Sequence, residues 1–213
     1  MKTQKTHNNL PLYILDVDSD ISIQEGVDAV ALVDAPAIKR GFLAFRSDTP
    51  TTMAFTVTSE DRHIISGPLM LADTPLLRLP PQVPEPCYIT FPAATIERIA
   101  QKFFTQGFHA SVNEMHDPER KLDGIVMFES FISDSTRGIL PIAGHGDAPE
   151  GSWFGSFKVE NEDAWKSIKD GTFTGFSVEG FFAYLEAEED VEATPEQQAL
   201  LAQIWDVLEN VAD

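Results

Sequence analysis

Prolines and glycines interrupt this chain so often that we expect most of its strands to be short. The 14 prolines and 13 glycines separate short apolar runs, such as those at 13–15, 27–33, 64–71 and 125–132. Residues 74–86 alone contain five prolines, which exclude a helix or a central strand there. Short apolar runs bounded by turn residues predict a fold built mainly from short strands.

Two internal segments have helical patterns. In residues 92–106, apolar side chains recur at the spacing of one helix face, namely at Ile96, Ile99, Ala100, Phe103 and Phe104. Residues 161–169 predict a second, shorter helix with Asn161 as its N-cap. Many strands, two internal helices and no regular strand–helix alternation predict a β-rich α+β fold, with a β-barrel and peripheral helices as the expected architecture.

Composition changes along the chain predict its domain organisation. Residues 1–9 are polar, and we expect a disordered tail there, followed by the main domain in residues 10–185. Residues 186–198 are acidic and lack large apolar side chains except Val191, which is typical of a linker. Residues 199–213 have the apolar periodicity of an amphipathic helix.

The charge of the chain excludes several classes of partner. Acidic residues outnumber basic ones by 34 to 15, so the formal net charge is −19. Nucleic acids and anionic membranes are therefore not expected partners, because binding them requires clustered Lys and Arg. The single cysteine, Cys87, cannot form an intrachain disulfide. With no apolar run approaching the roughly 18 residues of a membrane span and no signal-peptide pattern, we expect a cytoplasmic setting.

The segment 175–180 is the first candidate for chemistry, because Ser177 lies there between two glycines in an apolar strand pattern. One interpretation is a small polar residue at a close approach of two backbones. The other is a nucleophilic serine whose backbone a substrate must reach. The spacing G-x-S-x-x-G differs from the nucleophile elbow of α/β-hydrolases.

A nucleophilic serine needs a base, and histidine is the usual one. The chain has five histidines, at positions 7, 63, 109, 116 and 145. Of these, His116 follows an amphipathic strand pattern and precedes Asp117-Pro118, so we expect it at a strand end that opens into a turn.

Metal and cofactor chemistry has less support in the sequence. The group His109, His116, Asp117, His145 and Asp147 matches no zinc-ligand spacing. No glycine-rich phosphate loop is present either. We therefore expect neither a metal nor another cofactor.

Seven segments carry a family resemblance, at 30–37, 65–70, 95–103, 112–117, 124–132, 151–154 and 171–182. They include Val112-Asn113-Glu114-Met115-His116-Asp117 and Gly175-Phe176-Ser177-Val178-Glu179-Gly180. Taken in this order, they resemble the XkdF-like phage serine proteases, a branch of the prohead (capsid-maturation) proteases, which in turn are similar to herpesvirus assemblin.

The resemblance implies a β-barrel serine endopeptidase with Ser177 as the nucleophile and His116 as the base. An acidic residue must then orient His116. Glu129 is the first choice for that role, and Glu179 and Asp117 are the alternatives.

The resemblance also implies the setting of the reaction. The expected substrates are the scaffolding protein, the N-terminal segment of the major capsid protein of a tailed phage, and the protease itself. It implies an enzyme that acts inside the assembling prohead in the host cytoplasm, with a homodimer or homo-oligomer as a further expected state.

Two other functions stay open. Assemblin has a second histidine after its serine, whereas this chain has none beyond Ser177. A non-catalytic head or scaffold-associated protein that keeps the protease fold would fit that difference. An unrelated ligand-binding β-barrel is the third hypothesis.

Overall fold

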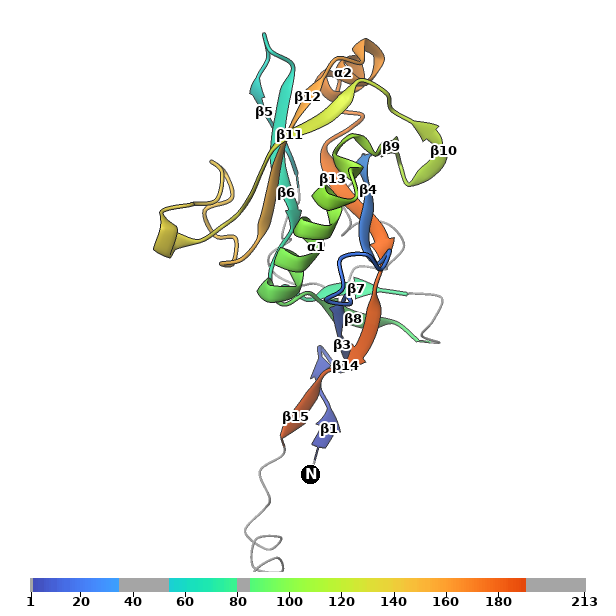
Figure 1. The fold of residues 1–213 in the computed structure, drawn as a ribbon, viewed down its shortest axis with the longest axis vertical. Coiled ribbons are helices and arrows are strands. Elements are labelled where there is room, and N and C mark those ends of the chain that lie inside the picture. Colours follow the sequence, from blue (N-terminus) through green and yellow to red (C-terminus); the bar gives the residue numbers. More distant parts are fainter. Residues whose placement is uncertain (1, 35–53, 80–84, 191–213) are drawn as a thin grey trace, which may run out of the picture.

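The computed structural model describes residues 2–34, 54–79 and 85–190 (Figure 1). The predicted linker beyond residue 190 and the predicted helix 199–213 lie outside these residues. Within them the chain forms short strands and two α-helices, which confirms the β-rich α+β class.

The first sheet carries the candidate serine. Its order is β10-β9-β4-β13. Strand β4 pairs antiparallel with β13 and parallel with β9, and β9 pairs antiparallel with β10. The bounds are β4 Gly26–Val33, β9 Val112–Glu114, β10 Asp117–Lys121 and β13 Gly175–Phe181.

The second sheet is antiparallel and supplies much of the core. Its order is β11-β12-β6-β5, and the strands are β5 Thr56–Ser59, β6 Ile64–Met70, β11 Ile125–Ile132 and β12 Trp153–Val159. Trp153, Phe157 and Val159 on β12 are fully buried. Their alternation along the strand follows the period of two that the sequence has there.

The third sheet joins both ends of the main domain. Its order is β14-β3-β8-β7, with β2 added on β3. The strands are β2 Thr6–His7, β3 Leu10–Asp16, β7 Leu76–Arg78, β8 Cys87–Thr90 and β14 Ala183–Glu186. A separate ribbon of β1 Lys2–Gln4 and β15 Glu188–Asp190 extends away from the body (Figure 1).

These pairings differ from the expected domain boundaries. Residues 2–4 and 6–7, expected in a disordered tail, form β1 and β2. Residues 186–190, expected in the acidic linker, end β14 and form β15. Backbone pairing with distant segments orders these polar stretches, and composition alone does not contain that information.

The helices match their predicted positions. Helix α1 Ala93–Thr105 packs against β4 and β12 and buries Ile96, Ile99 and Phe103, whereas Phe104 is exposed. Helix α2 Glu162–Lys169 begins at Asn161, whose side chain accepts a hydrogen bond from the Ala164 N–H at 2.9 Å. Two 3₁₀ turns, η1 Phe108–Ala110 and η2 Ser135–Arg137, complete the helical elements of the described residues.

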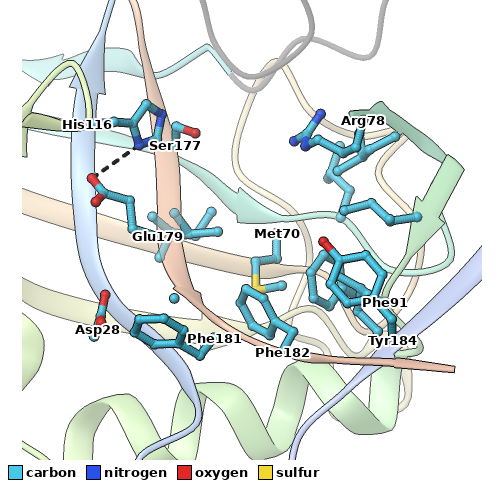
Figure 2. Close-up of a pocket in the computed structure, with 17 residues that line it drawn as sticks. Asp28, Met70, Arg78, Phe91, His116, Ser177, Glu179, Phe181, Phe182 and Tyr184 are labelled. Carbon is cyan, nitrogen blue, oxygen red and sulfur yellow. Dashed lines mark ion pairs between the residues drawn. The ribbon is translucent and has the colours of Figure 1, made fainter. Parts of the chain in front are cut away.

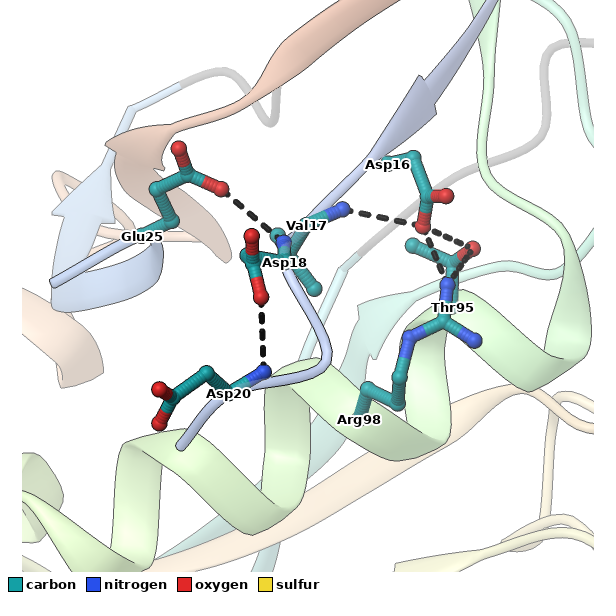
Figure 3. Close-up of polar contacts among 7 residues, drawn as sticks. All are labelled: Asp16, Val17, Asp18, Asp20, Glu25, Thr95 and Arg98. Carbon is teal, nitrogen blue, oxygen red and sulfur yellow. Dashed lines mark hydrogen bonds and ion pairs between the residues drawn. The ribbon is translucent and has the colours of Figure 1, made fainter. Parts of the chain in front are cut away.

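A polar contact fixes α1 to the end of β3 (Figure 3). The Asp16 carboxylate accepts from the Val17 N–H, the Thr95 hydroxyl and the Arg98 guanidinium. Burial alone would raise the pKa of Asp16, but these donors together lower it. The contact therefore holds the first turn of α1 against the third sheet.

The strands of the described residues do not form the closed β-barrel that we expected. The strands of the described residues divide into separate sheets, none of which closes on itself. One isolated bridge, Ala54 to Gly175, links the chain just before β5 to β13 of the first sheet. Closure into a barrel stays a prediction.

Candidate active site

Strand register brings the first members of the site onto one face of the first sheet. Ser177 lies opposite Ala31 of β4, and Ala31 lies opposite Asn113 of β9. Laterally paired residues point to the same face, and so do Ser177 and Glu179, which are two positions apart on β13. Ser177, Glu179 and Asn113 therefore share a face.

His116 reaches this face from the turn between β9 and β10. Asp117 pairs with Glu114, so Met115 and His116 form a two-residue hairpin loop. Their φ angles are 54° and 63°. Two positive φ angles are the signature of a type I′ turn, which usually contains Asn and Gly. Left-handed conformations of non-glycine residues cost roughly 1–2 kcal/mol each, and such strain clusters at functional sites.

A contact between His116 and Glu179 joins the two strands. His116 Nδ1 lies 3.1 Å from Glu179 Oε1, and the two side chains are 41% and 25% exposed. The Asn113 side-chain amide donates to the same oxygen at 2.7 Å. Asn113 is buried and its Oδ1 has no partner among the described residues. The imidazole is thus held by a carboxylate that a buried amide holds in turn.

His116 and Glu179 line one end of a cavity of about 770 Å³ (Figure 2). His116, Ser177, Glu179 and Asp28 lie at that end, and Arg78 lies on the opposite side. Apolar side chains form most of the wall between them, including Leu69, Met70, Leu76, Phe91 and Phe182. A mostly apolar cavity with a few convergent polar groups is the usual form of a binding site.

Asp28 adds a second carboxylate beside Glu179. Burial and the charge of Glu179 raise the pKa of Asp28. It lies at a register shift where Glu179 pairs with Ala29 and Gly180 pairs with Val27. The shift leaves Asp28 as the extra residue of β4 and turns it to the cavity.

Gly180 explains the second glycine of the serine segment. A Cβ atom at this position would lie 1.9 Å from the Gly26 carbonyl oxygen and 2.9 Å from Val27 Cα. Only glycine allows β13 and β4 to approach so closely at the register shift. The close backbone approach considered for this motif thus occurs at Gly180.

Glu129, the first choice for the orienting acid, lies elsewhere. It is on β11 in the second sheet, where it pairs with Ser156 of β12. Its Oε2 accepts from the Ser156 hydroxyl at 2.5 Å, and Ser156 in turn accepts from Ser66 at 2.8 Å. Glu129 is not among the residues that line the cavity.

Asp117, the second alternative, does not line the cavity either. Its side chain accepts from the Glu119 N–H at 3.0 Å. Of the three acids that the sequence offered, the structure brings Glu179 alone to His116 within the described residues.

The other histidines have aromatic neighbours instead. His63 stacks on Trp165 and His109 stacks on Phe104. His7 contacts Tyr88 edge-on, and His145 contacts Phe154 edge-on.

Within residues 2–34, 54–79 and 85–190, no group of three or more His, Cys, Asp or Glu is placed to hold a metal ion. In the same residues, neither helix is long and apolar enough to cross a membrane.

Sequence reasoning missed Asp28 and Arg78 as members of this cavity, and Asn113 as the hydrogen-bond donor to Glu179. Asn113 lies between Val112 and Glu114 in a predicted strand, and a strand pattern does not identify the partner of a side chain. Asp28 and Arg78 come from strands far from Ser177 in the sequence. Only the tertiary fold brings them together.

The fold and site thus define a β-rich α+β protein in which a cavity is lined at one end by a serine, a histidine and a carboxylate. A family model described as "Putative phage serine protease XkdF" matches residues 79–186, half of the chain. The chain belongs to this family of phage serine proteases. The matched segment contains His116, Ser177 and Glu179. No curated protein and no solved structure matches the chain.

Proposed function

We propose that this protein is an endopeptidase in which Ser177 is the nucleophile, His116 the general base and Glu179 the acid that orients His116. The contact between His116 Nδ1 and Glu179 Oε1 carries this proposal. With Nδ1 facing the carboxylate, Nε2 remains to accept a proton from the Ser177 hydroxyl, which lines the same cavity. Membership of a phage serine protease family supports the reaction class.

The proton moves twice in each half-reaction. Ser177 Oγ attacks the peptide carbonyl carbon while His116 Nε2 takes the hydroxyl proton. When the tetrahedral intermediate collapses, the C–N bond breaks and His116 gives that proton to the leaving amine. A water molecule then attacks the acyl ester by the same route, which releases the acid product and restores the Ser177 hydroxyl.

Glu179 and Asn113 act through His116. The Glu179 carboxylate fixes the orientation of the ring and stabilises the imidazolium that forms during attack. Asn113 donates to Glu179 Oε1 and so limits the rotation of that carboxylate. Glu129, already bonded to Ser156, takes no part in this arrangement.

The proposed substrates are the scaffolding protein, the N-terminal segment of the major capsid protein, and the protease itself. The reaction would take place in the assembling prohead, in the host cytoplasm. Two observations support a phage-assembly role: the family is a phage family, and the resemblance to prohead proteases includes the segments that carry His116 and Ser177.

Co-expression with the scaffold and capsid proteins of the same phage tests this function. Intact-mass measurements would compare the wild type with Ser177→Ala and with the control Ser167→Ala. Ser167 is on α2 and does not line the cavity. We expect defined cleavages with the wild type and the control, and a loss of about 10³-fold or more in rate with Ser177→Ala.

Two results would contradict the proposal. Identical cleavage by the wild type and Ser177→Ala would show that Ser177 is not the nucleophile. Intact chains in every sample would favour a structural protein that keeps the fold.

A further inference from the structure

The cavity beside Ser177 follows β13 along its length. Every residue from Ser177 to Phe182 lines it, the last of them just past the end of the strand. Successive side chains of a strand point to opposite faces, so a cavity that touches consecutive residues lies along an edge of the strand. Strand β4 pairs with one edge of β13. The cavity therefore runs along the other edge, with Ser177 at one end.

This contact is longer than the reach of one side chain. At about 3.3 Å per residue, the strand from Ser177 to Phe182 spans roughly 16 Å. An extended peptide that lies beside it has about five residues in the same length. The volume of about 770 Å³ is in the range of sites that enclose ligands much larger than one side chain. The cavity therefore has room for a segment of a polypeptide.

The wall across from β13 is apolar and belongs largely to the hydrophobic core. Residues 69–71 at the end of β6 are buried and line the cavity, as are Ile89 on β8 and Phe91 just after it. Phe182 packs edge-on against Phe91, with ring centroids 5.1 Å apart (Figure 2). Because the core holds these side chains in place, they offer a preformed apolar surface to a ligand.

The charged groups of the lining already interact within the chain. Glu179 contacts His116 and accepts from Asn113. Arg78 donates to a backbone carbonyl and has further interactions within the chain. Asp28 lies at the His116 end, beside Glu179. A charged ligand side chain on the apolar wall would lose its hydration, whereas an apolar one would remove two apolar surfaces from water.

We propose that this cavity binds an extended segment of the substrate polypeptide beside β13, and that it selects large apolar side chains on alternate residues within about five positions of the bond that Ser177 attacks. The alternation follows because only every second side chain of an extended segment points to the same wall. The inference rests on the proposed function for its reaction and adds the class of substrate.

A binding experiment tests the selection without requiring turnover. Full-length Ser177→Ala would be titrated by NMR with short peptides of Gly and Ser that carry a pair of leucines. The leucines are separated by a single residue in one peptide and adjacent in another, and Ser, Glu or Lys replaces both in the rest. We expect the separated pair to bind about tenfold or more tightly than the Ser peptide, because burying leucine removes apolar surface from water. The adjacent pair should bind more weakly than the separated pair, since its side chains point to opposite sides.

Variants assign that preference to the cavity. Phe182→Ala should reduce the advantage of the separated leucines about threefold or more, and Phe182→Leu should keep most of it. Leu76→Ser, on β7 in the same lining, should also reduce it. Phe128→Ala is the matched control, since Phe128 is exposed on β11 and does not line the cavity. Thermal unfolding shows which variants are folded.

Several results of this titration would overturn the inference. They are equal binding of the separated-leucine and Ser peptides, no binding of either, and tighter binding of the Glu or Lys peptide. A preference that is unchanged in both Phe182→Ala and Leu76→Ser would also overturn it.

Cleavage of a mixed peptide library by the wild type separates this inference from the proposed function. Cuts beside alternating apolar residues that disappear in Ser177→Ala support both. Cuts that depend on Ser177 but show no apolar preference nearby would overturn the selection by the cavity alone. Cuts that persist in Ser177→Ala would overturn the proposed nucleophile, whereas the peptide titration would still decide what the cavity binds.

Discussion

At the scale of single residues, the contacts of the carboxylates decide their roles. Glu179 faces His116 Nδ1 at 3.1 Å and accepts from Asn113, whereas Glu129 accepts from Ser156 in another sheet. The same side-chain type therefore has two different environments here, set by the partners that each strand supplies, and the proposed catalytic role falls to Glu179 alone.

Glu179→Gln and Glu129→Gln make a matched pair that tests this difference. We expect Glu179→Gln to lower kcat by about 10²–10⁴-fold, because an amide no longer stabilises the imidazolium or fixes its tautomer. Glu129→Gln should leave kcat within about threefold of the wild type, since it does not line the cavity. Steady-state peptide hydrolysis measures both, and a larger loss for Glu129→Gln would reverse the assignment.

Asp28 lowers the free energy of unfolding of the protein at neutral pH. Its raised pKa means that the folded state binds the proton more tightly than the unfolded state. Stability is therefore lost as the pH rises from the unfolded value of about 3.9 through the higher folded value. We expect Asp28→Asn to raise the Tm near pH 7, with a gain that shrinks towards pH 4.

Thermal unfolding over a series of pH values checks this expectation. Asp147→Asn is the control, because Asp147 lies exposed in a loop outside the cavity. A gain in Asp28→Asn that grows on acidification would contradict the linkage.

At the scale of elements, the pairing of β13 with β4 depends on one glycine. We expect Gly180→Ala to lower the free energy of unfolding by about 3 kcal/mol or more, because the new methyl group would lie 1.9 Å from the Gly26 carbonyl oxygen. The strands must separate to admit it, so Ser177 and Glu179 shift and activity falls with stability.

Gly146→Ala is the matched control for urea unfolding. No atom lies within 4 Å of a Cβ at position 146, and its φ is not in the left-handed region. A Gly180→Ala protein as stable as Gly146→Ala would show that the strands do not approach as described.

The elements also show which features can be predicted from sequence. Both helices were predictable, because the apolar spacing of α1 and the Asn161 cap of α2 are local patterns. Ser177 and His116 were proposed from a motif and a family resemblance, and their catalytic roles stay a prediction. The choice between Glu129 and Glu179 was not predictable, because it depends on β11 joining the second sheet and β9 the first. Such pairings connect segments far apart in the chain, and periodicity does not contain them.

At the scale of the whole molecule, the net charge of −19 opposes the compact state. We expect the Tm to rise when NaCl increases from about 20 to 500 mM, because the screening length falls from roughly 20 Å to 4 Å. Thermal unfolding near pH 4.4, the isoelectric point of the sequence, is the control. There the net charge is close to zero, so the salt effect should largely disappear; an equal rise at both pH values would rule out self-repulsion as the cause.

The order of the strands along the chain has a consequence for synthesis on the ribosome. The proposed catalytic group needs β4, β9 and β13 paired side by side, and β13 is one of the last strands to be translated. A growing chain therefore has neither Ser177 nor Glu179 in place until most of its length has emerged. Under the proposed function, translation itself therefore delays proteolysis, and partly made copies on one messenger would not cut their neighbours.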